Sequence, residues 1–349
     1  MNEKLVVPLN GRDYAKNKWE RLKKSPKAWY LTSKKLDKSG ERITRRTLAN
    51  LSADQDLIES LVDARYSDND LDGNAHFTSV LGVLMDSLRD DLNAYTEGAY
   101  EEQFDRTGLA IIELGGVHAA TTNVDDFLSP LDGYAIFIEI GTYYAIQLLA
   151  KALILENFKA DYIKYKEDSS WLIDLARDLY IEKDMEATRE VYFHNLPEEV
   201  EAEASAVQSS VTIKVMQFIA LHEFGHIVNE DRGVMSFNTI HVQHKSSNEA
   251  AEYSFEQEYN ADLFAINALF SDDAPTLNKW SGFYSIFYFF AWLHSVEMKT
   301  SKPISETHPP SLDRAWRLHE RLMELTHNED HGYTVLLKDV QIKFNIKGM

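Results

Sequence analysis

The pattern of apolar and polar positions predicts a chain built mostly of helices, with a small β element in its middle part. Apolar side chains recur at helical spacing through 142–158 and 169–184, and 195–230 is predicted to form one long helix or two joined helices. Short runs rich in isoleucine and bounded by glycine predict strands at 108–114 and 134–140. The second predicted strand leads directly into the apolar helix that follows it.

The two ends of the chain differ from this middle part. Residues 1–105 are mostly polar and are predicted to be helical. Near residue 106 the sequence changes from this polar helical pattern to strand-like runs, and this change marks the best boundary between the N-terminal region and a domain at 106–349. At the other end, alternating apolar residues in 333–337 and 340–346 predict a terminal hairpin.

Composition sets the class of protein. The chain has 349 residues, of which 44% are hydrophobic, so it can build a substantial core, and it has no cysteine. The absence of cysteine excludes disulfides, thiolate nucleophiles and cysteine-ligated metals, and it fits a reducing compartment. The longest aromatic run, 280–293, is shorter than the roughly 20 residues that span a bilayer, and the N-terminus lacks the pattern of a signal peptide. We therefore expect a cytoplasmic protein with no transmembrane segment, in which this run forms a buried helix, and membrane contact is the alternative.

Charge narrows the possible partners. The net charge of −20 argues against general binding to nucleic acid, because most of the surface would repel a polyanion. Residues 15–46 differ, since they hold twelve Lys or Arg against three acids. This segment is predicted to be a solvated basic face that lies against the acidic body. The alternatives are an arm that binds nucleic acid and a docking surface for an acidic protein partner.

One motif carries recognisable chemistry. Residues 220–228 read ALHEFGHIV, in which His222 and His226 are four apart and share one face of a helix, with Glu223 beside them. Two imidazoles at this spacing can hold one zinc ion, and the glutamate can reach a water molecule on the metal. A chance match is expected only roughly 0.04 times in a chain of this composition. Because the flanking residues are uncharged, as in a buried helix, we predict that His222 and His226 bind Zn²⁺.

A catalytic zinc site needs a third protein ligand and one open position. Within 256–270, Glu258 and Asp262 are again four apart, on a helix that then becomes apolar. We predict that Glu258 is the third metal ligand and that Asp262 accepts a hydrogen bond from a zinc histidine and so fixes its tautomer. The alternative ligands are nearby acids and histidines, namely Glu249, Glu252, Glu256, His241 and His244.

Together these motifs resemble a known class of enzyme. HExxH followed by ExxxD on a second helix resembles the gluzincin metallopeptidases, and HPPSLDR at 308–314 is similar to a signature of the membrane-associated prenyl-peptidase and heat-shock metallopeptidase group. As a gluzincin-like chain of this size without a transmembrane segment, the sequence also resembles the phage-exclusion peptidases. The resemblance implies an α+β, mostly helical, zincin-like fold with a small sheet, an active-site helix and a second ligand-bearing helix. It also implies that His308 stabilises the oxyanion and that Arg314 braces the site, although this sequence lacks the long transmembrane helices of that group.

The mechanism expected from these residues is hydrolysis of a peptide bond. Zinc held by its three protein ligands would lower the pKa of its bound water to about 7, and Glu223 would take the proton and return it to the leaving amine. His308 is the expected oxyanion donor, with Tyr253 and Tyr259 as alternatives. The expected substrate is an intracellular protein or peptide. A non-catalytic zinc-containing interaction or sensor module and a zinc hydrolase of non-peptide amides are the alternatives, but a structural zinc has no need of a general base such as Glu223.

Residues 68–79 match a calcium-binding loop only in part. Asp68, Asp70, Asp72 and Gly73 fit the pattern of an EF-hand, but Ser79 stands where a bidentate glutamate is needed. We expect a turn there, with calcium binding as the alternative.

Overall fold

The fold is seen in a computed structural model of the chain. The structure describes residues 75–105, 107–112, 117, 119–123, 134–157, 162–182, 198–229, 248–270, 277–300, 308–325, 338–341 and 343–344. Several sequence predictions lie outside these residues: the basic segment 15–46, the aspartate turn at 68–74, His241, His244 and the strand at 333–337.

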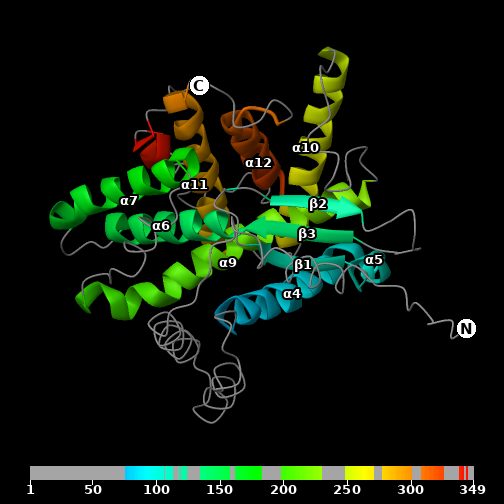
Figure 1. The fold of residues 1–349 in the computed structure, drawn as a ribbon, viewed down its shortest axis with the longest axis horizontal. Helices are drawn as coiled ribbons and strands as arrows, with labels where there is room; N and C mark the ends of the chain where they lie inside the picture. The colour runs from blue at the N-terminus through cyan, green and yellow to red at the C-terminus, as the bar shows by residue number, and fades with distance from the viewer. Residues whose placement is uncertain are drawn as a thin grey trace, which may run out of the picture.

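The described part of the chain is mostly helical with a small three-stranded sheet, which confirms the α+β, mostly helical class (Figure 1). In chain order the elements are α4 (Ala75–Thr96), α5 (Glu101–Asp105), β1 (Thr107–Ile112), β2 (Ala119–Asn123), β3 (Tyr134–Glu139), α6 (Ile140–Asn157), α7 (Tyr162–Glu182), α9 (Glu198–Val228), α10 (Asn248–Phe270), α11 (Leu277–Thr300) and α12 (Ser311–Leu325).

The sheet has the strand order β1-β3-β2, which Figure 1 shows above α4. β1 runs parallel to β3, and β2 runs antiparallel to β3 with Thr121 opposite Ile136. β3 takes the central place because its Ile136, Phe137 and Ile138 are all buried, as in a strand that is covered on both faces. β1 and β3 confirm the two predicted strands, whereas β2 was not predicted and forms an edge of the described sheet.

α9 is the central helix of the described core. It contacts α4, α6, α10 and α11 as well as β2 and β3, and its side chains from Val215 to Phe224 are almost all buried. It is one continuous helix, which is the first of the two arrangements predicted for 195–230. α6 follows β3 without a break and is buried along most of its length, because most of its residues are apolar (Figure 1).

The aromatic run 280–293 lies in α11 and is buried by the neighbouring helices. Phe283, Phe287, Phe290 and Trp292 are each at most 2% exposed. The prediction of a buried helix is therefore confirmed. The helices in the described ranges include none with the length and apolar character needed to cross a membrane.

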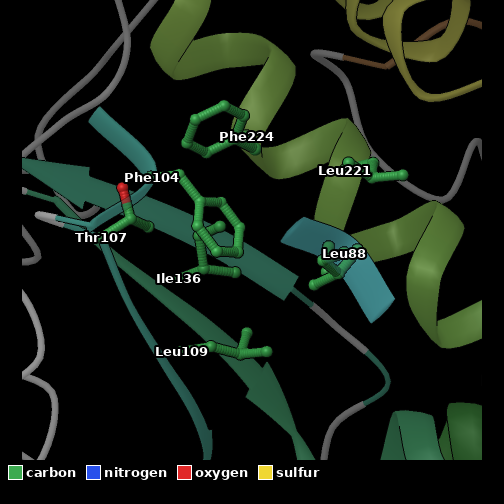
Figure 2. A pocket seen from close by; sticks show the side chains of 8 residues that line it. Leu88, Phe104, Thr107, Leu109, Ile136, Leu221 and Phe224 are labelled. Carbon is green, nitrogen blue, oxygen red and sulfur yellow. The ribbon is translucent and has the colours of Figure 1, made fainter. Parts of the chain in front are cut away.

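A small apolar cavity lies behind α9 and is bounded by α4, α5, β1 and β3 (Figure 2). Its lining consists of Leu88, Phe104, Thr107, Leu109, Ile136, Ala220, Leu221 and Phe224. Its open volume of about 10 Å³ has room for about one water molecule. The helix that carries HEFGH therefore rests on a closely packed core, and this cavity has no room for a ligand.

The predicted C-terminal hairpin is wrong where the structure describes it. Residues 338–341 and 343 are helical, so they cannot form the strand predicted at 340–346. Val340 and Phe344 are both buried, and the backbone N–H of Phe344 donates to the carbonyl of Val340 at 3.0 Å. Two buried side chains four residues apart share one face of a helical turn, which explains the local conformation.

α4 and α5 belong to the predicted N-terminal region, and they pack into the same core as α9. Leu84, Leu88 and Leu92 of α4 and Phe104 of α5 are buried members of the main hydrophobic cluster. The boundary near residue 106 stays a prediction.

Candidate active site

His222 and His226 lie side by side on α9 and face the same point. Their Nε2 atoms are 3.2 Å apart and their ring centroids 4.8 Å apart, as the i, i+4 spacing on a helix requires. His222 is buried and stacks on Phe218 one turn earlier, while His226 is half-buried. One face of α9 therefore presents two imidazole nitrogens from an apolar helix.

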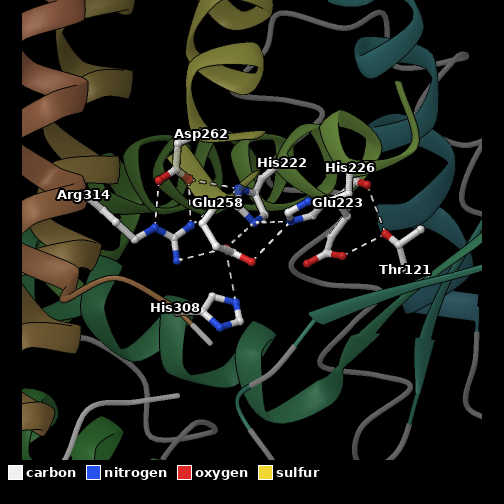
Figure 3. Close-up of polar contacts among 8 residues, drawn as sticks. All are labelled: Thr121, His222, Glu223, His226, Glu258, Asp262, His308 and Arg314. Carbon is white, nitrogen blue, oxygen red and sulfur yellow. Dashed lines mark hydrogen bonds and ion pairs between the residues drawn. The ribbon is translucent and has the colours of Figure 1, made fainter. Parts of the chain in front are cut away.

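Glu258 completes a group of three on the facing helix, α10. Its Oε2 lies 3.3 Å from Nε2 of His222, and its Oε1 lies 3.6 Å from Nε2 of His226 (Figure 3). Glu258 is only 7% exposed, and its Oε2 makes no hydrogen bond to any residue that the structure describes. A buried carboxylate in this position needs a cation as its partner.

The spacing of these three side chains fits a tetrahedral metal ion. Three ligands that each lie about 2.0–2.1 Å from a zinc ion are about 3.3–3.4 Å from one another. The separations of 3.2, 3.3 and 3.6 Å between the donor atoms are close to this value. The group of His222, His226 and Glu258 can therefore bind a metal ion.

The electrostatics of the group favour a bound cation. Burial lowers the pKa of His222, but Asp262 and Glu258 outweigh it and raise this pKa from 6.5 to about 10. Burial raises the pKa of Glu258, but His222, His308 and Arg314 hold it well below its usual range. Without a metal, His222 therefore carries a proton between two carboxylates. A metal cation would take over this positive charge and release the proton.

Asp262 contacts the ring nitrogen of His222 that lies away from Glu258. Its Oδ1 lies 2.9 Å from Nδ1 of His222, which leaves Nε2 as the nitrogen that faces Glu258. Arg314 holds Asp262 in turn with two hydrogen bonds, from Nε to Oδ2 and from Nη2 to Oδ1, both 2.7 Å long. Burial raises the pKa of Asp262, but the charge and hydrogen bonds of Arg314 have the larger effect. The pKa therefore lies below its usual value, and Asp262 is ionised.

α12 brings Arg314 to this position, and its first turn is anchored on α11. The backbone N–H and the hydroxyl of Ser311 donate to Oε1 of Glu297 at 3.1 and 2.9 Å. A carboxylate at the N-terminus of a helix is stabilised by the free backbone N–H groups there. Arg314 lies one turn later and is only 9% exposed, so its guanidinium is buried between α12 and α10.

His308 lies just before this helix and faces Glu258. Its Nε2 is 3.3 Å from Oε2 of Glu258, which places it at the edge of the three-residue group (Figure 3). Burial lowers the pKa of His308 to about 4, and the nearby charge of Arg314 adds to this effect. His308 is therefore neutral at pH 7.

Glu223 reaches the same region from α9 and is held by a strand. The hydroxyl of Thr121, in β2, donates to Oε2 of Glu223 at 2.8 Å (Figure 3). Glu223 is only 8% exposed. Sequence reasoning missed Thr121, because the segment AATTN carries no motif and the contact joins residues 102 positions apart.

The other candidate residues are not part of this arrangement as far as the structure describes them. Glu256 is exposed on α10, and the ring of Tyr259 lies 3.6 Å from the guanidinium carbon of Arg317. The side chains of Glu249, Glu252 and Tyr253 lie outside the described part.

Gly225 lets α9 and α10 come close enough to form the group. A Cβ at this position would lie 3.0 Å from Cα of Ala261 and 3.3 Å from Cβ of Phe264. Contacts this tight would push the two helices apart in a closely packed core. The glycine inside HEFGH therefore has a packing role, because His226 and Glu258 approach each other across this contact.

Comparison with known proteins identifies the family of this chain. The chain matches the family described as Peptidase U49 over residues 133–336, which is more than half of its 349 residues. The matched span contains His222, Glu223, His226, Glu258 and Asp262, together with HPPSLDR at 308–314. The same chain gives no match among curated proteins or among solved structures. The chain belongs to the peptidase U49 family.

Proposed function

We propose that this peptidase is a zinc-dependent endopeptidase whose metal is held by His222, His226 and Glu258. The observation that carries the proposal is the convergence of these three donors, two buried and one half-buried, at separations of 3.2–3.6 Å. A ligand set of two imidazoles and one carboxylate suits zinc, and it leaves a fourth position open for chemistry. The lack of cysteine agrees with a metal site built from nitrogen and oxygen, and also with a cytoplasmic location.

Glu223 is the proposed general base. Bound zinc would supply Lewis-acid activation of a water molecule near neutral pH and polarise the carbonyl to be attacked. Glu223 accepts the proton of the attacking water on its carboxylate and then passes it to the leaving amine as the C–N bond breaks. Its low exposure of 8% keeps bulk water away from this proton transfer.

His308 is the proposed donor to the oxygen of the attacked carbonyl. A neutral imidazole can donate one hydrogen bond, and the lowered pKa of His308 keeps it neutral at pH 7. Its Nε2 lies 3.3 Å from Oε2 of Glu258, at the border of the proposed metal site. Asp262 and Arg314 position His222 in this scheme, since their contacts fix which of its nitrogens faces the metal.

The proposed substrate is a protein segment in extended conformation that pairs with β2. β2 is an edge strand of the described sheet, so a peptide can add to it through backbone hydrogen bonds. The same strand touches Glu223 through Thr121, so a peptide bound there lies beside the general base. The basic segment 15–46 lies outside the described residues, and a docking surface for an acidic protein partner stays an alternative for it.

Removal of the metal tests this proposal. The purified protein is expected to contain about one zinc per chain and to cleave denatured casein, and 1,10-phenanthroline should stop the cleavage. Adding zinc back after dialysis should restore it. Cleavage that continues at the same rate in metal-free protein would rule out a zinc-dependent mechanism.

Replacing His308 with alanine tests its proposed role as a donor. Turnover is expected to fall about 10²–10³-fold while the zinc content and the binding of substrate stay nearly unchanged, because the hydrogen bond forms mainly in the transition state. Steady-state kinetics with zinc analysis measure this. His319→Ala on α12 is the matched control and should turn over normally, whereas near-normal turnover of the His308 variant would refute the assignment.

A further inference from the structure

Thr121 is the one residue of β2 whose side chain is seen to touch Glu223. We propose that Thr121 is a positioning residue, which holds one oxygen of the Glu223 carboxylate so that the other faces the reacting water. This inference rests on the proposed function and deepens it. It assigns a role to a residue outside the span 133–336 that matches the family.

The contact has the geometry of a strong hydrogen bond. Thr121 Oγ1 lies 2.8 Å from Oε2 of Glu223 and 3.1 Å from the backbone carbonyl of the same residue. Hydrogen bonds to an ionised acceptor are shorter and stronger than those between neutral groups. Within the described residues, Thr121 is the only hydrogen-bond partner of this carboxylate. Its hydroxyl is therefore the described group that limits rotation of the Glu223 side chain.

The two oxygens of Glu223 are left in different surroundings by this contact. Figure 3 shows Oε2 turned to Thr121, and the second oxygen turned away from Thr121 on the side of Glu258. A glutamate side chain has three rotatable bonds, so an unrestrained carboxylate would spend much of its time in other orientations. Fixing one oxygen removes most of this freedom before the substrate arrives, which is the general basis of preorganisation in catalysis.

A hydroxyl suits this position because it can both donate and accept. When Glu223 carries the proton taken from water, the oxygen of Thr121 can accept a hydrogen bond from the carboxyl group. The hydrogen of Thr121 then has the backbone carbonyl of Glu223 within 3.1 Å as its acceptor. The contact can therefore persist through the transfer of the proton to the leaving amine.

The position of Thr121 on β2 links the general base to the substrate strand. Thr121 pairs with Ile136 of the buried central strand β3, and its neighbour Ala120 pairs with Phe137, which is only 2% exposed. β2 is thus fixed on one side by the core, while its other side is an edge in the described sheet. A peptide that pairs with this edge would lie on the strand that also holds Glu223, and the side chain of Thr121 makes that connection.

Two variants separate the hydroxyl from the shape of the residue. Thr121→Val removes the hydroxyl and keeps the branched shape, and Thr121→Ser keeps the hydroxyl. Cleavage of denatured casein should be about 10–100-fold slower in Thr121→Val and within about 3-fold of wild type in Thr121→Ser. All three proteins should hold about one zinc per chain. Crystal structures of the zinc-loaded forms should show the Glu223 carboxylate displaced only in Thr121→Val.

Thr107→Val is the matched control for this experiment. The hydroxyl of Thr107 in β1 makes a hydrogen bond of the same length, 2.8 Å, to the carbonyl of Gln103, and it should be dispensable for turnover. A Thr121→Val protein with wild-type turnover and an unmoved Glu223 would overturn the inference. If the wild type itself cleaves nothing, the proposed function fails. The crystal structures then still decide the positioning role, because an unmoved carboxylate refutes it and a displaced one supports it.

Discussion

Replacing His222 or His226 with alanine is expected to leave the protein without zinc. Each change removes one of three donors whose separations match a tetrahedral ion, and the two donors that remain cannot enclose the metal. The wild type should contain about one zinc per chain by elemental analysis, and each variant close to none. Circular dichroism should show that the variants keep their helices, because α9 is held by its buried side chains from Val215 to Phe224.

Two further variants test whether Glu258 binds the metal directly and Asp262 indirectly. Glu258→Ala should also lose zinc, whereas Asp262→Ala should only weaken zinc binding, by roughly 10–100-fold, because Asp262 acts through His222. Glu256→Ala is the matched control, since Glu256 is exposed on the same helix and should not affect the metal. Full zinc in both histidine variants would refute the site, and loss of zinc in Glu252→Ala but not in Glu258→Ala would refute the choice of the third ligand.

Glu223→Gln is expected to keep its zinc and lose its activity. The amide has nearly the same shape as the carboxylate but cannot accept the proton of the attacking water, so turnover should fall by about 10²–10⁴-fold. None of the three proposed metal ligands is altered, so the zinc content should equal that of the wild type. Rates of casein cleavage and elemental analysis on the same sample measure both quantities.

Glu256→Gln makes the same chemical change on an exposed residue and should leave turnover unchanged. A Glu223→Gln protein that cleaves casein at the wild-type rate would show that another group carries the proton. Loss of zinc in this variant would instead mean that Glu223 binds the metal.

The elements that sequence could predict are those whose apolar pattern is set by burial. β3 and α6 are buried along most of their length, so both could be predicted from their largely apolar sequences. β2 was missed because its edge position needs no apolar run, and AATTN has none. The C-terminal strand was wrongly predicted because V-Q-I-K-F alternates like a strand, while Val340 and Phe344 also satisfy helical spacing and both are buried.

The same distinction holds for the candidate site. His222, His226, Glu258 and Asp262 could be proposed from spacing alone, because an i, i+4 pair on a helix shares a face whatever surrounds it, and the structure brings the two pairs together. The partner of Arg314 could not be deduced in this way. Its bond to Asp262 joins residues 52 positions apart on different helices, so it depends on how α10 and α12 pack.

Hydrolysis at this site is the central proposal, and the N-termini of proteins in cells test it most directly. Cells that express the wild type should contain a small set of new N-termini, found by mass spectrometry, that are missing from cells expressing Glu223→Gln at the same level. The two proteins differ by one amide in place of one carboxylate, so their other interactions should match. Identical sets of N-termini in both cell types would contradict the proposal that this protein is a Glu223-dependent zinc endopeptidase.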